Sequence, residues 1–171
     1  MKTKTIKKGG VTTPTTREEN MTQEEKVKQF IKQNGLTMDC KQVEHNPIMA
    51  HAQSKELYNS MTHYKVTIKR RFKVYGNYLD TRYGFKQMTL VYSQGSAFKE
   101  QPNLESVLEC LYSDSNYEDN LDDFCDSLGF SQDTPEERKK SNIIFQATKK
   151  QTDKLKKLLD NDLSNLANVF A

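Results

Sequence analysis

The side chains most suited to a chemical role are carboxylates, which are concentrated in one stretch of the chain. Residues 103–127 contain eight Asp and Glu residues and no Lys or Arg. Carboxylates spaced over two short helices can imitate the regular phosphate charge of duplex DNA and occupy the arginine-rich groove of a nuclease or DNA-binding protein. The contact set that we predict for such a partner is Glu105, Glu109, Glu118, Asp119, Asp122 and Asp123.

Cationic side chains are concentrated in a second stretch, residues 61–75, which holds five Lys and Arg residues and no acid. The four that fall on one face of an extended strand are Lys65, Lys69, Arg71 and Lys73. With Tyr75 and Tyr78 near the end of the strand, this basic face is suited to following the phosphates of a nucleic acid. The alternative is that each charged stretch is only a solvated surface and that the two attract each other within the fold.

Metal-ligating side chains do not form a recognisable motif. Cys40, His45 and His51 are loosely spaced, and Cys110 and Cys125 belong to separate apolar stripes, unlike the CxxC and HExxH spacings of zinc sites. We expect no metal and no cofactor, although zinc binding by the first three residues is left open. The two later cysteines are expected to pack in the core as small apolar side chains.

Signatures of catalysis are also missing from the sequence. The histidines at 45, 51 and 63 lie outside any GxSxG or cysteine-protease pattern, and the seven glycines form neither GxGxxG nor a P-loop. The carboxylates of Asp122, Asp123 and Asp126 lack the spacing and the glycine of an EF-hand loop. The sequence therefore predicts a binding protein and not an enzyme.

The elements that position these groups are expected to form one domain. The chain has 171 residues, of which 35% are hydrophobic and none is Trp, so the core must be small. We predict a basic, disordered tail at 1–20 and a single domain at 21–171. The apolar runs are far shorter than the roughly 18 residues that span a bilayer, and no signal peptide is visible. We expect a cytoplasmic protein whose three cysteines stay reduced.

Periodicity predicts the elements of the first half of the domain. A capping box at Thr22 starts a helix over about 22–34. Alternation predicts a strand over 63–74 that pairs with a second strand over 85–92. The intervening region is ambiguous, because its alternation after residue 36 is weak and 48–60 suits either a loop or a short helix.

The C-terminal part, about 103–170, is predicted to be helical. Apolar stripes define two short helices, the second ending at Gly129. A capping box at Thr134 starts a long helix that runs to about 159, followed by a short terminal helix. The predicted fold is α+β: a small antiparallel sheet, the hairpin at about 63–92, packed by the C-terminal group of helices.

From about 45 to 165 the chain resembles a widespread family of small proteins encoded by tailed bacteriophages and related mobile elements. The order of several short pieces carries the resemblance: Asn46-Pro47-Ile48-Met49, His63 to Ile68, Tyr92-Ser93-Gln94-Gly95, Val107 to Leu111, Asp123-Phe124-Cys125 and Leu128-Gly129-Phe130. The resemblance implies a phage or mobile-element origin, a bacterial host cell as location and an α+β fold. It implies no particular activity.

Two hypotheses from different classes follow. The first is an inhibitor of the anti-CRISPR type, a DNA mimic that binds a host protein, a CRISPR effector nuclease, through the acidic contact set. The second is a nucleic-acid-binding accessory protein of phage replication or recombination, which uses the basic strand face and the basic tail. A structural or interaction protein with no link to nucleic acid is the third alternative, and the oligomeric state is left open.

Overall fold

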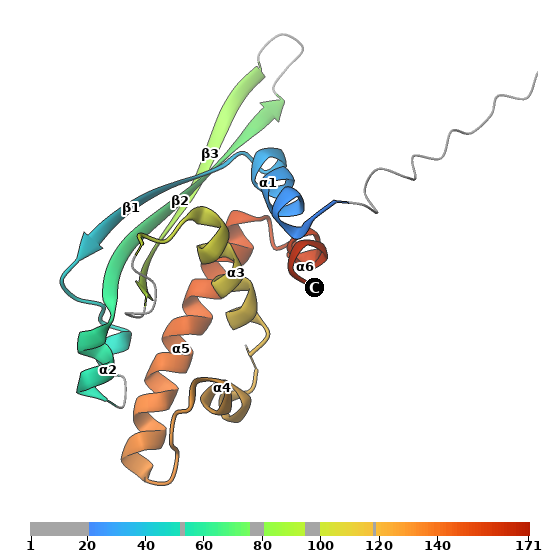
Figure 1. Ribbon diagram of the computed structural model, residues 1–171. Helices are drawn as coiled ribbons and strands as arrows, with labels where there is room; N and C mark the ends of the chain where they lie inside the picture. Colours follow the sequence, from blue (N-terminus) through green and yellow to red (C-terminus); the bar gives the residue numbers. More distant parts are fainter. Residues whose placement is uncertain (1–20, 52–53, 76–80, 95–99, 118) are drawn as a thin grey trace, which may run out of the picture.

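A computed structural model describes residues 21–51, 54–75, 81–94, 100–117 and 119–171 (Figure 1). The predicted tail at 1–20, Tyr78 and Glu118 lie outside these ranges. The α+β fold is confirmed: a three-stranded antiparallel sheet is packed by helices. In chain order the elements are α1 (Gln23–Gln33), β1 (Leu36–Val43), the 3₁₀ helix η1 (Met49–His51), α2 (Lys55–Ser60), β2 (Thr62–Tyr75), β3 (Thr81–Gln94), α3 (Leu104–Ser115), α4 (Leu121–Leu128), α5 (Pro135–Leu158) and α6 (Ser164–Phe170).

The sheet has the order β1-β2-β3. β1 pairs with β2 only as far as Arg70, whereas β2 and β3 stay paired out to Tyr75 and Thr81. The outer parts of β2 and β3 therefore project past β1 as a two-stranded ribbon, which Figure 1 shows extending away from the helices. We call residues 71–75 and 81–85 the ribbon.

The predicted hairpin is confirmed, but the start of its second strand needs correction. The region that is ambiguous in the sequence contains a third strand, β1, and two short helices, η1 and α2, which agree with the helical alternative for 48–60. The second hairpin strand begins earlier than residue 85, at Thr81. Gly84, predicted to lie in the connection, is inside this strand opposite Phe72. A Cβ atom at Gly84 would lie 2.5 Å from the Phe72 ring, so the glycine makes room for that ring to lie across the neighbouring strand.

The helix boundaries follow the predicted local signals. Capping boxes are present at the start of α1, between Thr22 and Glu25, and at the start of α5, between Thr134 and Glu137. These boxes satisfy N–H groups that have no partner within a helix. α4 ends at Gly129, whose φ of 66° is left-handed and suits a residue without a side chain.

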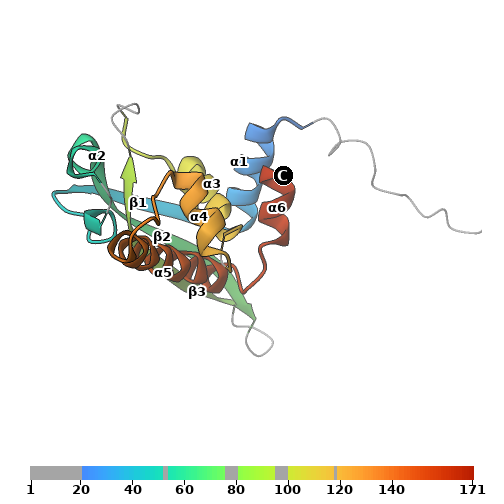
Figure 2. The same ribbon diagram turned by 90° about the horizontal axis from the view of Figure 1, so that it is seen from below.

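The core lies on one face of the sheet. Val66, Ile68 and Leu90 point toward the helices and are buried against side chains of α3, α5 and α6. A second, smaller cluster between α4 and α5 is built around Phe124 and contains the buried Cys125, as predicted. Figures 1 and 2 both show α1 and α6 side by side at one end of the molecule. Within the described ranges, no helix has the length and apolar character needed to cross a lipid bilayer.

Candidate functional site

The face of the sheet opposite the core carries the predicted basic residues. Directly paired strand residues share a face, and the alternation of β2 therefore places its four predicted cations together. Lys65, Lys69, Arg71 and Lys73 lie on this face, and all four side chains are exposed. Lys41 of β1 is exposed as well and lies opposite Lys65. We call this surface, with the adjoining side of the ribbon, the open face.

Three aromatic side chains lie exposed on the open face. Tyr75 is 82% exposed, Phe85 is 68% exposed and Tyr83 is 49% exposed. In the β2–β3 register, Phe85 lies opposite Arg71 and Tyr83 lies opposite Lys73. The guanidinium carbon of Arg71 lies 3.8 Å from the ring centroid of Tyr83 and 5.9 Å from that of Phe85. Cations and aromatic rings are thus interleaved on one surface.

Tyr83 and Phe85 are functional candidates that the sequence interpretation missed. The signal that identifies them is the alternation of the strand: odd-numbered residues such as 83 and 85 point to the face opposite the buried, even-numbered Met88 and Leu90. The sequence interpretation begins the second strand at residue 85. Tyr83 and Gly84 then fall in the connection between the strands, and the alternation is not followed back to Tyr83.

The open face stays positively charged because it carries little acid. In the described parts of the three strands, Asp39 is the one carboxylate on this face, and its Oδ2 accepts a hydrogen bond from Lys69 Nζ at 2.6 Å. This hydrogen bond and the charge of Lys69 hold the pKa of Asp39 below its ordinary value. Lys65, Arg71 and Lys73 form no ion pair with any described residue.

The root of the ribbon is anchored to the end of α5. The Arg70 side chain donates to the backbone oxygen of Leu158 at 3.0 Å and pairs with Asp160 at 2.5 Å. Lys86 of β3 pairs with the same carboxylate. Asp160 and Asn161 have φ values of 61° and 66°, so the predicted break after α5 is a left-handed turn that directs Asp160 toward both strands.

The predicted acidic contact set lies on α3, on α4 and between them, and two of its members face cations of α5. Asp119 lies 3.3 Å from Lys149, and Asp122 lies 3.5 Å from Arg138. Asp123 accepts a hydrogen bond from the Asn120 side chain. The remaining described members are Glu105, which is half-buried, and Glu109, which is exposed. Part of the acidic surface is therefore neutralised by the same chain, through α5 and not through the basic strand.

Asp114, an acid of the same stretch, lines a cavity. Burial raises the pKa of its carboxyl to about 6. The cavity has a volume of about 310 Å³ and lies between β3, α3, α4, α5 and the segment that contains η1 and α2. Cys110, one turn earlier on α3, lines the same cavity and lies with its Sγ 3.0 Å from the hydroxyl of Tyr92. Burial raises the pKa of both the Cys110 thiol and the Tyr92 hydroxyl.

The histidines do not gather into a metal site within the described ranges. His63 is buried, and its Nδ1 lies 2.7 Å from Ser93 Oγ, which also accepts a hydrogen bond from Asn46 at 2.6 Å. Burial lowers the pKa of His63. His45 bonds instead to the hydroxyl of Tyr58 at 2.7 Å. Nowhere in this part of the chain do three or more potential metal ligands gather. The expectations of no metal and no enzymatic activity stay predictions.

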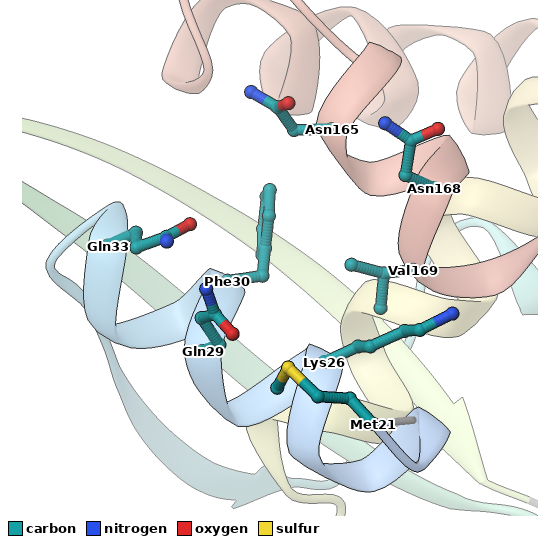
Figure 3. A pocket seen from close by; sticks show the side chains of 8 residues that line it. All are labelled: Met21, Lys26, Gln29, Phe30, Gln33, Asn165, Asn168 and Val169. Atoms are coloured by element: carbon teal, nitrogen blue, oxygen red, sulfur yellow. The ribbon is translucent and has the colours of Figure 1, made fainter. Parts of the chain in front are cut away.

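A further hollow of about 390 Å³ lies between α1 and α6 (Figure 3). The amide side chains of Gln29, Gln33, Asn165 and Asn168 line it, together with the largely buried Phe30. Amides supply hydrogen bonds but neither a nucleophile nor a proton-transfer group at neutral pH. The exposed Lys26 also lines the hollow and is the one titratable side chain among its lining residues, so the hollow offers hydrogen bonds and one ammonium group but no acid–base pair.

In comparisons with known proteins, no protein-family model matches the chain, and neither a curated protein nor a solved structure is significantly similar to it. The resemblance to tailed-phage proteins stays a prediction. The functional argument therefore depends on the geometry of the open face, of the acidic helices and of the Asp114 cavity.

Proposed function

We propose that this protein binds single-stranded nucleic acid on the open face of its sheet. The observation that carries the proposal is the placement of Tyr83 and Phe85 beside Arg71 on a surface that no described acid other than Asp39 neutralises. Exposed aromatic rings stack on unpaired bases, and each stacked base contributes about 1–3 kcal/mol of binding free energy. Lys and Arg beside the rings attract the backbone phosphates.

The dimensions of the open face suit a strand of several nucleotides. Alternate residues of a β-strand are about 7 Å apart, so Lys65 and Lys73 are separated by roughly 26 Å. Three cations at alternate positions of β2, Lys69, Arg71 and Lys73, form a continuous row. A flexible single strand can follow this row while its bases turn toward the rings, whereas bases inside a duplex are already stacked on each other.

The inhibitor hypothesis has weaker support from the geometry. A DNA mimic must present its carboxylates to the cations of a partner, but Asp119 and Asp122 already face Lys149 and Arg138. Exposed ion pairs are weak, so these contacts reduce the acidic surface without abolishing it. The hypothesis stays a prediction, and charge reversal of Asp119, Asp122 and Asp123 in a nuclease-inhibition assay is its direct test.

The proposal is tested by fluorescence anisotropy with a labelled oligo-dT strand and with a duplex of equal length. We expect the protein to bind the single strand more tightly. For about four phosphate contacts, raising the salt from about 50 to about 200 mM should weaken binding roughly 50-fold. Lys65→Gln and Lys73→Gln should each weaken binding and make it less sensitive to salt, whereas Lys139→Gln on α5 serves as the charge-matched control.

Substitution of the rings separates stacking from charge. Phe85→Ala and Tyr83→Ala leave the net charge unchanged and should each weaken binding to the single strand by roughly 5- to 150-fold. Ile143→Ala removes another exposed apolar side chain, on α5, and should have no effect. Absence of binding at low salt would refute the proposal. Preferred binding of the duplex, with Phe85→Ala as tight as the wild type, would instead indicate that the ribbon enters a DNA groove.

A further inference from the structure

The cavity beside Asp114 has the composition of a small-molecule site. Ligand pockets in proteins are mostly apolar and contain a few convergent polar groups. This cavity is lined by Met49, Val91, Phe124, Phe130 and Ile144 among other apolar side chains. Its volume of about 310 Å³ is at the lower end of the range that holds drug-sized molecules.

Asp114 is the one charged side chain among the residues that line the cavity. No described cation pairs with its carboxyl group, and no described donor bonds to it. Asp114 is half-buried, and an ionised carboxylate that has lost part of its hydration and has no partner is unfavourable in apolar surroundings. Strongly perturbed carboxyl groups in pockets are characteristic of functional sites.

The walls around the carboxyl group favour a cation. Tyr92, Phe124 and Phe130 contribute aromatic rings to the cavity, and the faces of such rings attract organic cations. The apolar side chains favour a hydrocarbon body over a hydrated metal ion, which would need several oxygen ligands. The required ligand therefore combines one ammonium group with an apolar chain or ring.

We propose that the cavity between β3, α3, α4 and α5 binds an apolar organic ammonium ion, with its charged nitrogen paired to the Asp114 carboxylate and its hydrocarbon part against Phe124, Phe130 and Ile144. This site lies on the core side of the sheet edge and is independent of nucleic-acid binding on the open face. If no ammonium ion binds in this cavity, the proposal that nucleic acid binds on the open face is unaffected.

The test compares three probes of similar shape: hexylammonium, 1-hexanol and hexanoate. Thermal unfolding of the full chain is measured with each probe at neutral pH. A probe that binds raises Tm by roughly 3–6 °C when its concentration is about ten times its dissociation constant. We expect the rise to be largest for hexylammonium, smaller for 1-hexanol and absent for hexanoate. Chemical-shift changes in ¹H–¹⁵N spectra should centre on the amides of Asp114, Phe124 and Phe130, and not on β2.

Two variants decide whether the Asp114 carboxylate causes the larger rise in Tm with hexylammonium. Asp114→Asn keeps the shape of the side chain and removes its charge, so hexylammonium should lose its advantage over 1-hexanol. Glu109→Gln removes an exposed charge from the same helix and should behave like the wild type. Equal effects of hexylammonium and 1-hexanol on the wild type, an advantage that survives in Asp114→Asn, or no effect of any probe would each overturn the proposal.

Discussion

A carboxyl group in an apolar cavity lowers the stability of a protein whenever the group is ionised. Asp114 is the clearest case in this chain, because burial raises its pKa from 3.8 to about 6. Its folded state binds a proton more tightly than its unfolded state, so the free energy of unfolding should fall as the pH rises from about 4 to about 6 and stay low above that range. At neutral pH the penalty is on the order of 3 kcal/mol, and a neutral amide in the same place recovers only part of it, because the amide is polar as well.

Asp114→Asn should therefore stabilise the protein at neutral pH by on the order of 1–2 kcal/mol and flatten the dependence of stability on pH between about 4 and 6. Urea unfolding at a series of pH values measures both effects. Asp126→Asn on α4 is the control, since that carboxyl is exposed. A neutral-pH stability that falls in Asp114→Asn would show that the ionised carboxylate has a stabilising partner after all.

Among the elements, the link between α1 and β1 depends on a single glycine. Gly35 has a φ of +57°, and a Cβ atom there would lie 2.6 Å from the backbone oxygen of Arg71. Its own backbone oxygen accepts a hydrogen bond from the Arg71 N–H at 3.0 Å. The close approach holds the start of β1 against β2 at the position where the ribbon leaves the sheet.

Gly35→Ala should lower the free energy of unfolding by about 2–4 kcal/mol, because both the left-handed backbone and the overlap with a carbonyl group oppose the new methyl group. Gly129 provides a matched comparison: its φ is +66°, but no atom lies within 4 Å of a Cβ built there. Gly129→Ala should therefore lower the free energy of unfolding by only about 1–2 kcal/mol, the cost of the backbone conformation alone. Equal decreases in the two variants would show that the close approach to Arg71 is unimportant.

Elements with local signals could be predicted from the sequence, and elements that depend on distant partners could not. The capping boxes at Thr22 and Thr134 contain both of their hydrogen-bonding partners within four residues, so they define helix starts without tertiary information. β1 has weak alternation and becomes a strand by pairing with β2, which begins about twenty residues later. Gly84 suggests a turn in isolation, and only the Phe72 ring opposite explains its position inside a strand.

At the scale of the whole molecule, the same distinction applies to the candidate site. The alternation of Lys65, Lys69, Arg71 and Lys73 predicts a common face, which the structure shows. Which face is covered depends on the packing of helices, and so does the pairing of Asp119 and Asp122 with cations of α5. Sequence patterns therefore identify the charges of both hypotheses but not the property that separates them, namely which of these charges are paired within the folded chain.

The first twenty residues add a second source of positive charge to a molecule with a formal net charge of +3. They contain Lys2, Lys4, Lys7, Lys8 and Arg17 against two carboxylates. The buried core begins at Val27, so deletion of residues 1–20 should leave Tm unchanged within about 1 °C, which thermal unfolding of the shortened chain measures.

If nucleic acid binds to the open face, the shortened chain should bind the oligo-dT strand only a few-fold more weakly. Each phosphate of a single strand that the protein contacts adds about 0.7 to the logarithmic slope that describes how salt weakens binding. Four phosphates bound on the sheet would keep a slope near about −2.8, measured by anisotropy from about 50 to about 200 mM salt. Disappearance of binding together with its salt dependence would locate the bound phosphates at residues 1–20. If binding and its salt dependence are both retained, the bound phosphates lie on the sheet. Phe85→Ala should then still weaken binding by the shortened chain, because stacking depends on the ring and not on residues 1–20.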